Sequence, residues 1–323
     1  MRKKQLIASI MLLCSIAIAG CGAEKSVNEN GAGNVENAET AVQSDGKSIT
    51  HEWGTYKIEQ APQKVVTLDF SFMDTLTSLG VTPVGNAGVG TTKFPEYLQD
   101  QLQATVADVG ERKAPNLEVI QSLKPDLIIA SVDRHSMIRN ELEGIAPTVA
   151  FDDVSYDQVM DNVKNIAEIL GKQKEAEQVA AGLNEKIAAV KQQITDAPSI
   201  VVAGYFDDMF TVWIKDSFVG SLLSQVGAEY AFNGEKSNLE GKGEGVKMTL
   251  ERLHELNPDF IMLYGDKPDK LLSNPLYQDL KSVKDQHFIV VDRNLWARGR
   301  GPIAAGKILD ETLANLTGNA VSK

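Results

Sequence analysis

The chain has 323 residues, and its 44 acidic residues outnumber its 32 basic residues, which gives a net charge of -12. So acidic a chain is a poor match to nucleic acid or to an anionic membrane surface. Its length allows either one large domain or two lobes after a short leader.

The N-terminus has the pattern of a bacterial lipoprotein signal. Arg2, Lys3 and Lys4 precede an apolar run over residues 6–19 that is too short to span a membrane comfortably, and small residues lead to Cys21. We expect cleavage after residue 20 and acylation of Cys21, for example by palmitate. A plain signal peptide is the alternative, which the cysteine in that position disfavours. Cleavage also removes Cys14, so no disulfide can form, and it leaves 29 basic residues against 44 acidic ones.

Residues 21–47 are rich in Gly, Asn, Glu, Ala and Ser and have no apolar periodicity, which predicts a flexible tether. We divide the rest into an N-terminal lobe (48–170), a connecting helix (171–196) and a C-terminal lobe (197–323).

Strands and helices alternate through the first lobe, which predicts a parallel sheet covered by helices. Apolar runs predict strands, and apolar residues at helical spacing next to Gly or Pro predict helices. The expected elements are an edge hairpin over 49–58, strands over 64–68, 81–85, 127–130 and 147–151, and helices over 69–79 and 116–123.

Two longer helices follow the first lobe. One is expected over residues 156–170, and the second over 174–194 is roughly 30 Å long, the width of a small domain. A helix of that length between two sheets is more naturally a connecting rod than part of either lobe.

The second half of the chain repeats a pattern from the first half. After a strand over 200–203, residues 249–262 match residues 116–129: both have a polar residue, Leu-Glu, an apolar helix, Leu-x-Pro-Asp and an apolar strand. Two equivalent α/β lobes in one chain indicate a ligand bound between them.

Near the C-terminus, an expected buried strand over 288–291 is followed by a loop with three arginines and then by a helix that begins near Ile303, with Pro302 suited to its first turn. Arg298 and Arg300 are two residues apart, so their side chains point the same way if the loop is extended. Guanidinium groups bind carboxylates in a two-pronged fork, so this cluster in an acidic chain indicates an anionic ligand. A solvated basic loop is the alternative.

Taken together, these patterns resemble the substrate-binding lipoproteins of iron–siderophore ABC importers, relatives of the cobalamin and hydroxamate-siderophore binding proteins. The resemblance covers about residue 49 to the end of the chain. It rests on residues 65–69, 74–76 and 79–81, on 109–112 followed by 115–118, on 123–128 and 145–148, and on the arginine loop. It implies two Rossmann-like lobes with mostly parallel sheets, joined by one long helix, with small closing motions.

The same resemblance implies an anionic ferric ligand, either ferric citrate or a citrate-based siderophore, whose own oxygens saturate the iron. The protein then needs no metal ligands or cofactor, only side chains that neutralise the chelate. A further N-lobe arginine of the citrate-type members falls near Phe94, where this chain has only Lys93. The expected ligand-binding residues are Arg112, Arg134, Arg293, Arg298 and Arg300, with Trp296, Tyr205 and Trp213 as candidate packing aromatics. Ordinary packing in the core or at the rim is the alternative for the aromatics.

The family also implies a partner. Glu118 and Glu251 are equivalent residues of the repeat, each in the first turn of a helix. In the cobalamin and siderophore importers, glutamates of the binding protein in this context dock onto arginines of the two permease subunits. Simple complementarity to the helix dipole is the alternative. We expect a monomer held by lipid on the outer face of the cytoplasmic membrane, delivering its ligand to a permease and its ATPase.

Other functions are less compatible with the sequence. It has no Gly-x-Ser-x-Gly motif, no phosphate-binding loop and no cysteine nucleophile, and Pro258 replaces the second histidine of a zinc-protease motif begun by His254-Glu255. A lipid-anchored enzyme, adhesin or scaffold, a bare metal binder, and a haem or cobalamin binder of the same fold are the alternatives. His135 lies beside Arg134 and could reach the cleft, but a satisfied surface histidine is favoured over a ligand there.

Overall fold

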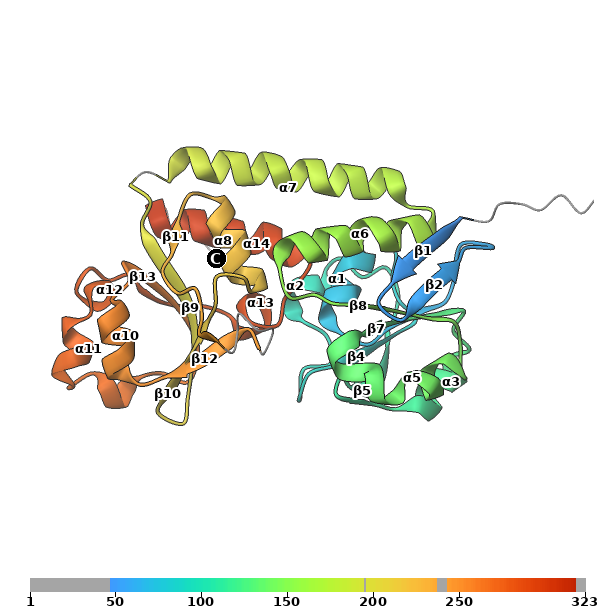
Figure 1. Cartoon of the computed structure of the whole chain (residues 1–323), viewed down its shortest axis with the longest axis horizontal. Coiled ribbons are helices and arrows are strands. Elements are labelled where there is room, and N and C mark those ends of the chain that lie inside the picture. Colours follow the sequence, from blue (N-terminus) through green and yellow to red (C-terminus); the bar gives the residue numbers. More distant parts are fainter. Residues whose placement is uncertain (1–46, 195, 237–242, 318–323) are drawn as a thin grey trace, which may run out of the picture. The chain divides into compact units, whose positions relative to one another are not determined.

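A computed structural model describes residues 47–194, 196–236 and 243–317, which form two α/β lobes joined by one long helix (Figure 1). The expected signal peptide, Cys21 and tether residues up to 46 lie outside the described residues. Within the described ranges, no helix is both long enough and apolar enough to cross a lipid bilayer.

The N lobe is built on a six-stranded sheet in the order β6-β5-β4-β3-β7-β8, in which only the β5–β6 pair is antiparallel. Alternate residues of β7 enter two hydrophobic clusters, because successive side chains of a strand point to opposite faces. Helices α1 and α6 cover one face, and α3 and α5 cover the other. The elements are β1 (Ser48–His51), β2 (Gly54–Lys57), β3 (Val65–Thr67), α1 (Phe70–Ser78), β4 (Gly85–Gly88), α2 (Glu96–Gln99), β5 (Ala107–Glu111), β6 (Ala114–Pro115), α3 (Leu117–Leu123), β7 (Leu127–Ser131), α4 (Val132–His135), η1 (Ser136–Ile138), α5 (Arg139–Glu143), β8 (Thr148–Phe151) and α6 (Tyr156–Leu170).

The C lobe has a second six-stranded sheet in the order β12-β10-β9-β13-β14, with β11 also paired to β9. Strands β9, β11, β13 and β14 run parallel, whereas β10 is antiparallel to both of its neighbours. The elements are β9 (Ser199–Phe206), β10 (Met209–Trp213), α8 (Phe218–Gln225), β11 (Glu229–Tyr230), β12 (Gly245–Met248), α10 (Leu250–Leu256), β13 (Phe260–Gly265), η2 (Asp269–Leu271), α11 (Pro275–Asp279), α12 (Lys281–Lys284), β14 (Phe288–Val290), α13 (Arg293–Trp296) and α14 (Pro302–Thr317).

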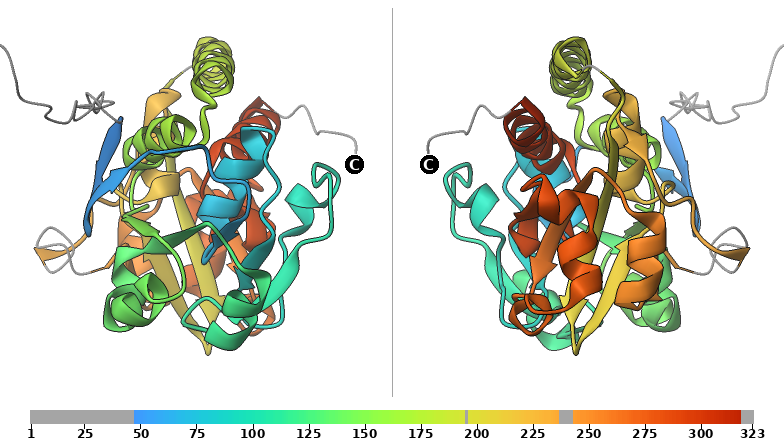
Figure 2. Two further views of the ribbon diagram at one scale, coloured as in Figure 1. Left: turned by 90° about the vertical axis from the view of Figure 1, so that its right-hand side faces the viewer. Right: turned by 90° about the vertical axis from the view of Figure 1, so that its left-hand side faces the viewer.

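The lobes are joined by α7 (Gln173–Gln193), whose 21 residues span roughly 30 Å. Figure 2 shows α7 end-on, outside the sheets and against α6 and α14, with which it is in contact. The predicted fold class, two lobes connected by one long helix, is therefore confirmed, and the second sheet is mixed rather than wholly parallel.

The predicted repeat is present in the structure down to its caps and loops. Asn116 and Thr249 cap the N-termini of α3 and α10 by accepting the N–H of the third helical residue. Lys124 and Asn257 end the two helices in the left-handed conformation, with φ of 50° and 42°. The aspartate of each Pro-Asp step accepts a backbone N–H at the start of the neighbouring strand of the sheet. Lys64 donates to Asp126, and Ser199 donates to Asp259. Equivalent residues are 133 positions apart (249 − 116).

Two strands differ from the prediction. The second strand of the N lobe is Gly85–Gly88, not 81–85, because its sequence Gly-Asn-Ala-Gly lacks the apolar signal of a strand although all four residues are buried. A side chain at Gly85 would come within 2.8 Å of Val109, so packing explains the glycine. The expected buried strand over 288–291 is the edge strand β14, where Val290 is 65% exposed.

One buried carboxylate of the N lobe, Asp74, forms hydrogen bonds to the C lobe. Asp74 on α1 accepts the backbone N–H groups of Ile303 and Ala304 in the first turn of α14, both at 2.9 Å. Gly301 makes this approach possible, since a Cβ there would lie 2.3 Å from the Asp74 carboxyl carbon. Burial raises the pKa of Asp74 to about 7, although the two N–H groups favour its charged form.

This raised pKa predicts a particular pH dependence of stability. The folded state binds a proton at Asp74 up to about pH 7, whereas the unfolded chain releases it near 3.8, so stability falls as pH rises through that window. The contribution approaches about 4 kcal/mol. About 3 kcal/mol of this loss falls between pH 5 and pH 7, so denaturant titrations at pH 5 and pH 8 should show that part in the parent and not in Asp74→Asn. Asp161→Asn, an exposed control, should behave like the parent, and parallel profiles for Asp74→Asn and the parent would contradict this role of Asp74.

Candidate ligand-binding cleft

All five arginines expected at the ligand line one open cleft of about 550 Å³ between the lobes. Arg112 and Arg134 come from the N lobe, and the other three come from the segment between β14 and α14. With Lys113, six cationic side chains face the cleft against two acidic ones, Glu111 and Glu244. The full lining is Val89, Glu111, Arg112, Lys113, Arg134, Thr211, Trp213, Glu244, Gly245, Tyr264, Arg293, Ala297, Arg298 and Arg300.

The two N-lobe arginines are held by one buried carboxylate behind them. Nη1 of Arg112 and Nη1 of Arg134 both lie 3.3 Å from Asp69, which caps α1 and is almost wholly buried. Although burial opposes its charge, Arg134, Arg112 and Arg300 hold the pKa of Asp69 below its usual range. Asp69 thus fixes both guanidinium groups at the rim of the cleft and stays ionised.

His135 supports the same wall from the core rather than reaching the ligand. Its Nδ1 accepts the Ser131 N–H at 2.9 Å, so its Nε2 donates to the Arg112 carbonyl at 2.7 Å. Burial lowers the pKa of His135, which keeps the ring neutral. His135 is therefore a satisfied histidine, as favoured, but it is fully buried rather than on the surface.

Arg300 connects the two lobes through carboxylates on each side. It makes a bidentate pair with Glu244 of its own lobe, and its Nη1 lies 3.5 Å from Asp153 and 3.1 Å from the Asp153 carbonyl of the other lobe. Burial disfavours its charge, but Glu244 and Asp153 more than offset this and raise the pKa of Arg300. The positive charge of Arg300 is therefore already balanced by the carboxylates of Glu244 and Asp153 in the ligand-free protein.

Arg293 and Arg298 differ from the other three because no carboxylate of the described residues lies within 4.0 Å of either. Arg298 donates to Asn294 at 2.8 Å and across the cleft to Thr92 at 3.3 Å. Arg293 stacks over the Phe206 ring at 4.4 Å. Burial and the charges of Arg293 and Arg112 lower the pKa of Arg298, so an anion placed here would relieve this repulsion.

Sequence analysis expected Arg298 and Arg300 to point the same way only if their loop is extended. A short helix, α13, occupies the start of that segment, and the two side chains reach different partners. Both nevertheless line the cleft.

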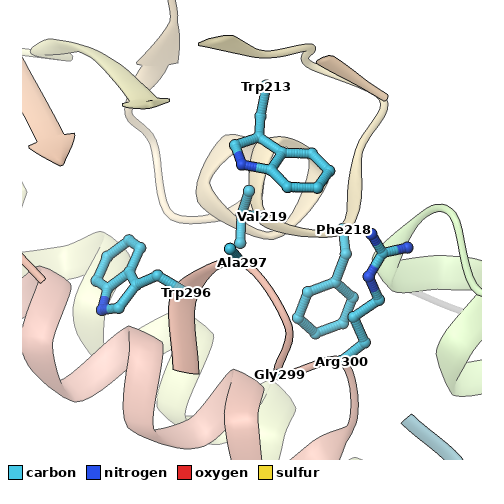
Figure 3. A pocket seen from close by; sticks show the side chains of 7 residues that line it. All are labelled: Trp213, Phe218, Val219, Trp296, Ala297, Gly299 and Arg300. Atoms are coloured by element: carbon cyan, nitrogen blue, oxygen red, sulfur yellow. The ribbon is translucent and has the colours of Figure 1, made fainter. Parts of the chain in front are cut away.

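Trp296 and Tyr205, two of the aromatics expected at the ligand, are buried elsewhere. Trp296 is fully buried and its indole N–H donates to Glu311 on α14 at 2.6 Å. Trp296 lines a small cavity of about 10 Å³ that shares Trp213, Ala297 and Arg300 with the cleft. Figure 3 shows the Trp296 and Arg300 side chains on opposite sides of it. Tyr205 is 3% exposed, packs on Phe210 and donates to Asp208.

The aromatic residues that do line the cleft are Trp213 and Tyr264. The Trp213 indole N–H donates to the Tyr264 hydroxyl at 3.0 Å, which leaves the hydroxyl proton free to meet a ligand oxygen. Gly204, beside Tyr264 in the sheet, leaves room for this ring, because a Cβ there would lie 2.6 Å from it. Burial raises the pKa of Tyr264 despite three nearby arginines, so its phenol remains protonated.

Sequence analysis did not select Lys113, Tyr264 or Glu244. Lys113 adjoins Arg112, and Tyr264 lies near the carboxyl end of a predicted strand, so the sequence position of each residue could have indicated that it lies at the site. Glu244 had none, since it belongs to no motif and no predicted element.

Glu118 and Glu251 are exposed and occupy the second position of α3 and α10, as the repeat requires. Neither lines the cleft. Their placement agrees with a role outside the ligand site, and their part in docking remains a prediction.

Comparison with known proteins identifies relatives along most of the chain. Residues 65–295 match the periplasmic binding protein family. A putative ABC transporter substrate-binding lipoprotein of Bacillus subtilis, YhfQ, is 35% identical over 96% of this chain and 97% of its own length. The Fe(3+)-citrate-binding protein YfmC of the same organism is 32% identical over 91% of each chain.

Solved structures show the same architecture. Staphylococcus aureus SirA complexed with staphyloferrin B superposes with a TM-score of 0.71 at 29% identity, covering 84% of this chain and 98% of that one. Bacillus subtilis FeuA complexed with ferri-bacillibactin gives 0.72 at 24% identity, covering 84% and 99%, which shows a shared fold.

Proposed function

The chain belongs to the periplasmic binding protein family, and we propose that it captures an anionic ferric chelate, ferric citrate or a citrate-based siderophore, for an ABC importer. The observation that carries this proposal is the cleft itself, where five arginines from both lobes converge and two of them lack a carboxylate partner within the described residues. A relative named as an Fe(3+)-citrate-binding protein supports the ligand class.

The charges of the cleft favour carboxylates over neutral ligands. Arg112 and Arg134 share Asp69, and Arg300 is balanced by Glu244 and Asp153, so the uncompensated charge lies at Arg293 and Arg298. Guanidinium pairs with carboxylate through two parallel hydrogen bonds, which ammonium cannot do. An iron ion already saturated by its chelator needs only this outer contact.

The delivery step follows from the same assignment. We propose that Cys21 anchors the mature chain to the outer face of the cytoplasmic membrane and that a monomer presents Glu118 and Glu251 to the two permease subunits. Relatives named as lipoproteins, YhfQ and YfiY of Bacillus subtilis, support the anchor. The exposure of both glutamates supports their availability for docking.

The proposal is tested by titrating the mature chain with ferric citrate, iron-free citrate, haem and cobalamin while tryptophan fluorescence is recorded. Trp213 in the cleft should be quenched by the ferric chelate. We expect saturable binding of ferric citrate or a citrate-based ferric siderophore, without turnover. Tight binding of haem or cobalamin, with no binding of any ferric carboxylate chelate, would show that the ligand assignment is wrong.

A further inference from the structure

Glu244 differs from the other carboxylates that balance the cleft arginines, because it lies on the side of the ligand. Asp69 and Asp153 are buried and do not line the cleft, whereas Glu244 lines it and keeps 17% of its side chain exposed. A carboxylate behind a guanidinium leaves the outer N–H groups available to a ligand. A carboxylate in front of it occupies them.

The pair of Arg300 and Glu244 uses the donors that a ligand carboxylate would need. Nη1 of Arg300 donates to one Glu244 oxygen at 2.7 Å, and Nη2 donates to the other. Nη1 also donates to the Asp153 carbonyl at 3.1 Å. This two-pronged contact is the geometry in which a guanidinium binds any carboxylate. Glu244 therefore occupies the position on Arg300 that a carboxylate of the ligand would take.

The backbone at Glu244 is held by the sheet of the C lobe. The Ile214 N–H donates to the Glu244 carbonyl at 2.9 Å, and Gly245, the next residue, pairs with Trp213 across the β10–β12 ladder. The Arg300 guanidinium lies over the Trp213 ring, 5.6 Å from its centroid. The same sheet edge therefore positions both partners of the pair, which makes the pair a built part of the ligand-free cleft.

We propose that Glu244 is a specificity-determining residue, which keeps ligand carboxylates away from Arg300 and directs them to Arg293 and Arg298. The inference rests on the proposed function, because it concerns the same anionic ligand. It favours a chelate that presents carboxylates to two arginines of the C lobe over one that requires all three. A ligand carboxylate that approached Arg300 would meet the like charge of Glu244, which disfavours that approach.

The experiment removes this charge and compares it with another charge of the same cleft. Glu244→Gln keeps the size of the side chain but replaces the carboxylate by a neutral amide. Glu111→Gln is the matched control, since Glu111 lines the cleft but accepts the Gly90 N–H and has no cationic partner within 4.0 Å in the described chain. The double variant Glu244→Gln/Arg300→Ala tests whether the effect requires Arg300. Each is titrated with ferric citrate at low and high salt by tryptophan fluorescence.

We expect Glu244→Gln to bind ferric citrate about tenfold more tightly than the parent at both salt concentrations. The neutral amide gives way to a ligand carboxylate, which then gains a charge-assisted fork with Arg300. Glu111→Gln should gain at most about threefold, and high salt should remove that gain, because it arises from the general field of the cleft. The double variant should return to within about threefold of the parent, since the pair as a whole carries no net charge.

Three results would overturn the role of Glu244 and leave the proposed function in place. These are a gain no larger than that of Glu111→Gln, a gain that persists in the double variant, and weaker binding by Glu244→Gln, which would show that Glu244 holds Arg300 in place for the ligand. The two single variants decide the question by themselves if the double variant does not fold. A parent chain that binds no ferric carboxylate chelate refutes the proposed function and this inference together.

Discussion

Arg298→Ala should weaken the binding of ferric citrate about ten- to a hundredfold. Arg298 is half-buried, has no carboxylate within 4.0 Å in the described chain, and is repelled by Arg293 and Arg112. A ligand carboxylate there forms charge-assisted hydrogen bonds of roughly 1.5–3 kcal/mol, which sets the expected loss. The dissociation constant is measured by fluorescence titration at low and high salt.

Two further variants distinguish direct contact from general attraction. Arg298→Lys keeps the charge but loses the fork, so it should recover only part of the affinity. Arg139→Ala removes a half-buried arginine of the N lobe that contacts Glu143 and Trp53 and does not line the cleft, and it should leave affinity unchanged. If Arg298→Lys binds as tightly as the parent, and added salt abolishes the alanine defect, Arg298 only steers the ligand from a distance.

Asp69→Asn should lower the free energy of unfolding by about 3–5 kcal/mol, because Arg112 and Arg134 lose the buried carboxylate that they share. Asparagine is as good a helix cap as aspartate, so the residue 69 side chain can still accept the Phe70 N–H of α1. The variant therefore measures the loss of the negative charge rather than the loss of the cap. The loss is measured by denaturant titration of the ligand-free chain at pH 7.

Ferric citrate should reverse much of this loss. A bound carboxylate can replace Asp69 as the partner of the two arginines, so the melting temperature should rise more on ligand addition in Asp69→Asn than in the parent. Asp108→Asn, which removes a partly exposed carboxylate paired with Lys93, is the control and should change neither quantity appreciably. Equal ligand-induced shifts in Asp69→Asn and the parent would place the ligand away from Arg112 and Arg134.

Much of the fold followed from local pattern. The capped helices α3 and α10, the long helix α7 and the strand β7 combine strong apolar periodicity with Pro, Gly or capping residues, and each formed within about one residue of its expected bounds. Strand β4 did not follow, because Gly85 and Gly88 are selected by close packing rather than by strand propensity. The burial of β14 was overestimated because apolar content does not reveal that a strand lies at the edge of a sheet.

The five arginines converge on one cleft, which sequence spacing alone could not establish, since Arg112 and Arg298 lie in different lobes. The sequence could not predict which of these arginines are paired with carboxylates of the protein and which are not. Arg300 is neutralised by Glu244 and Asp153, whose approach depends on how the two lobes pack. Trp296 was expected at the ligand because it lies within the arginine segment, but it packs inward and pins α13 to α14 through Glu311.

The most direct test of ligand capture between the lobes is a crystal structure of the mature chain with ferric citrate bound. We expect ligand carboxylate oxygens about 2.7–2.9 Å from guanidinium nitrogens of both lobes, Arg112 or Arg134 on one side and Arg293 or Arg298 on the other. A chelate bound outside this cleft, or held by residues of one lobe alone, would contradict the account.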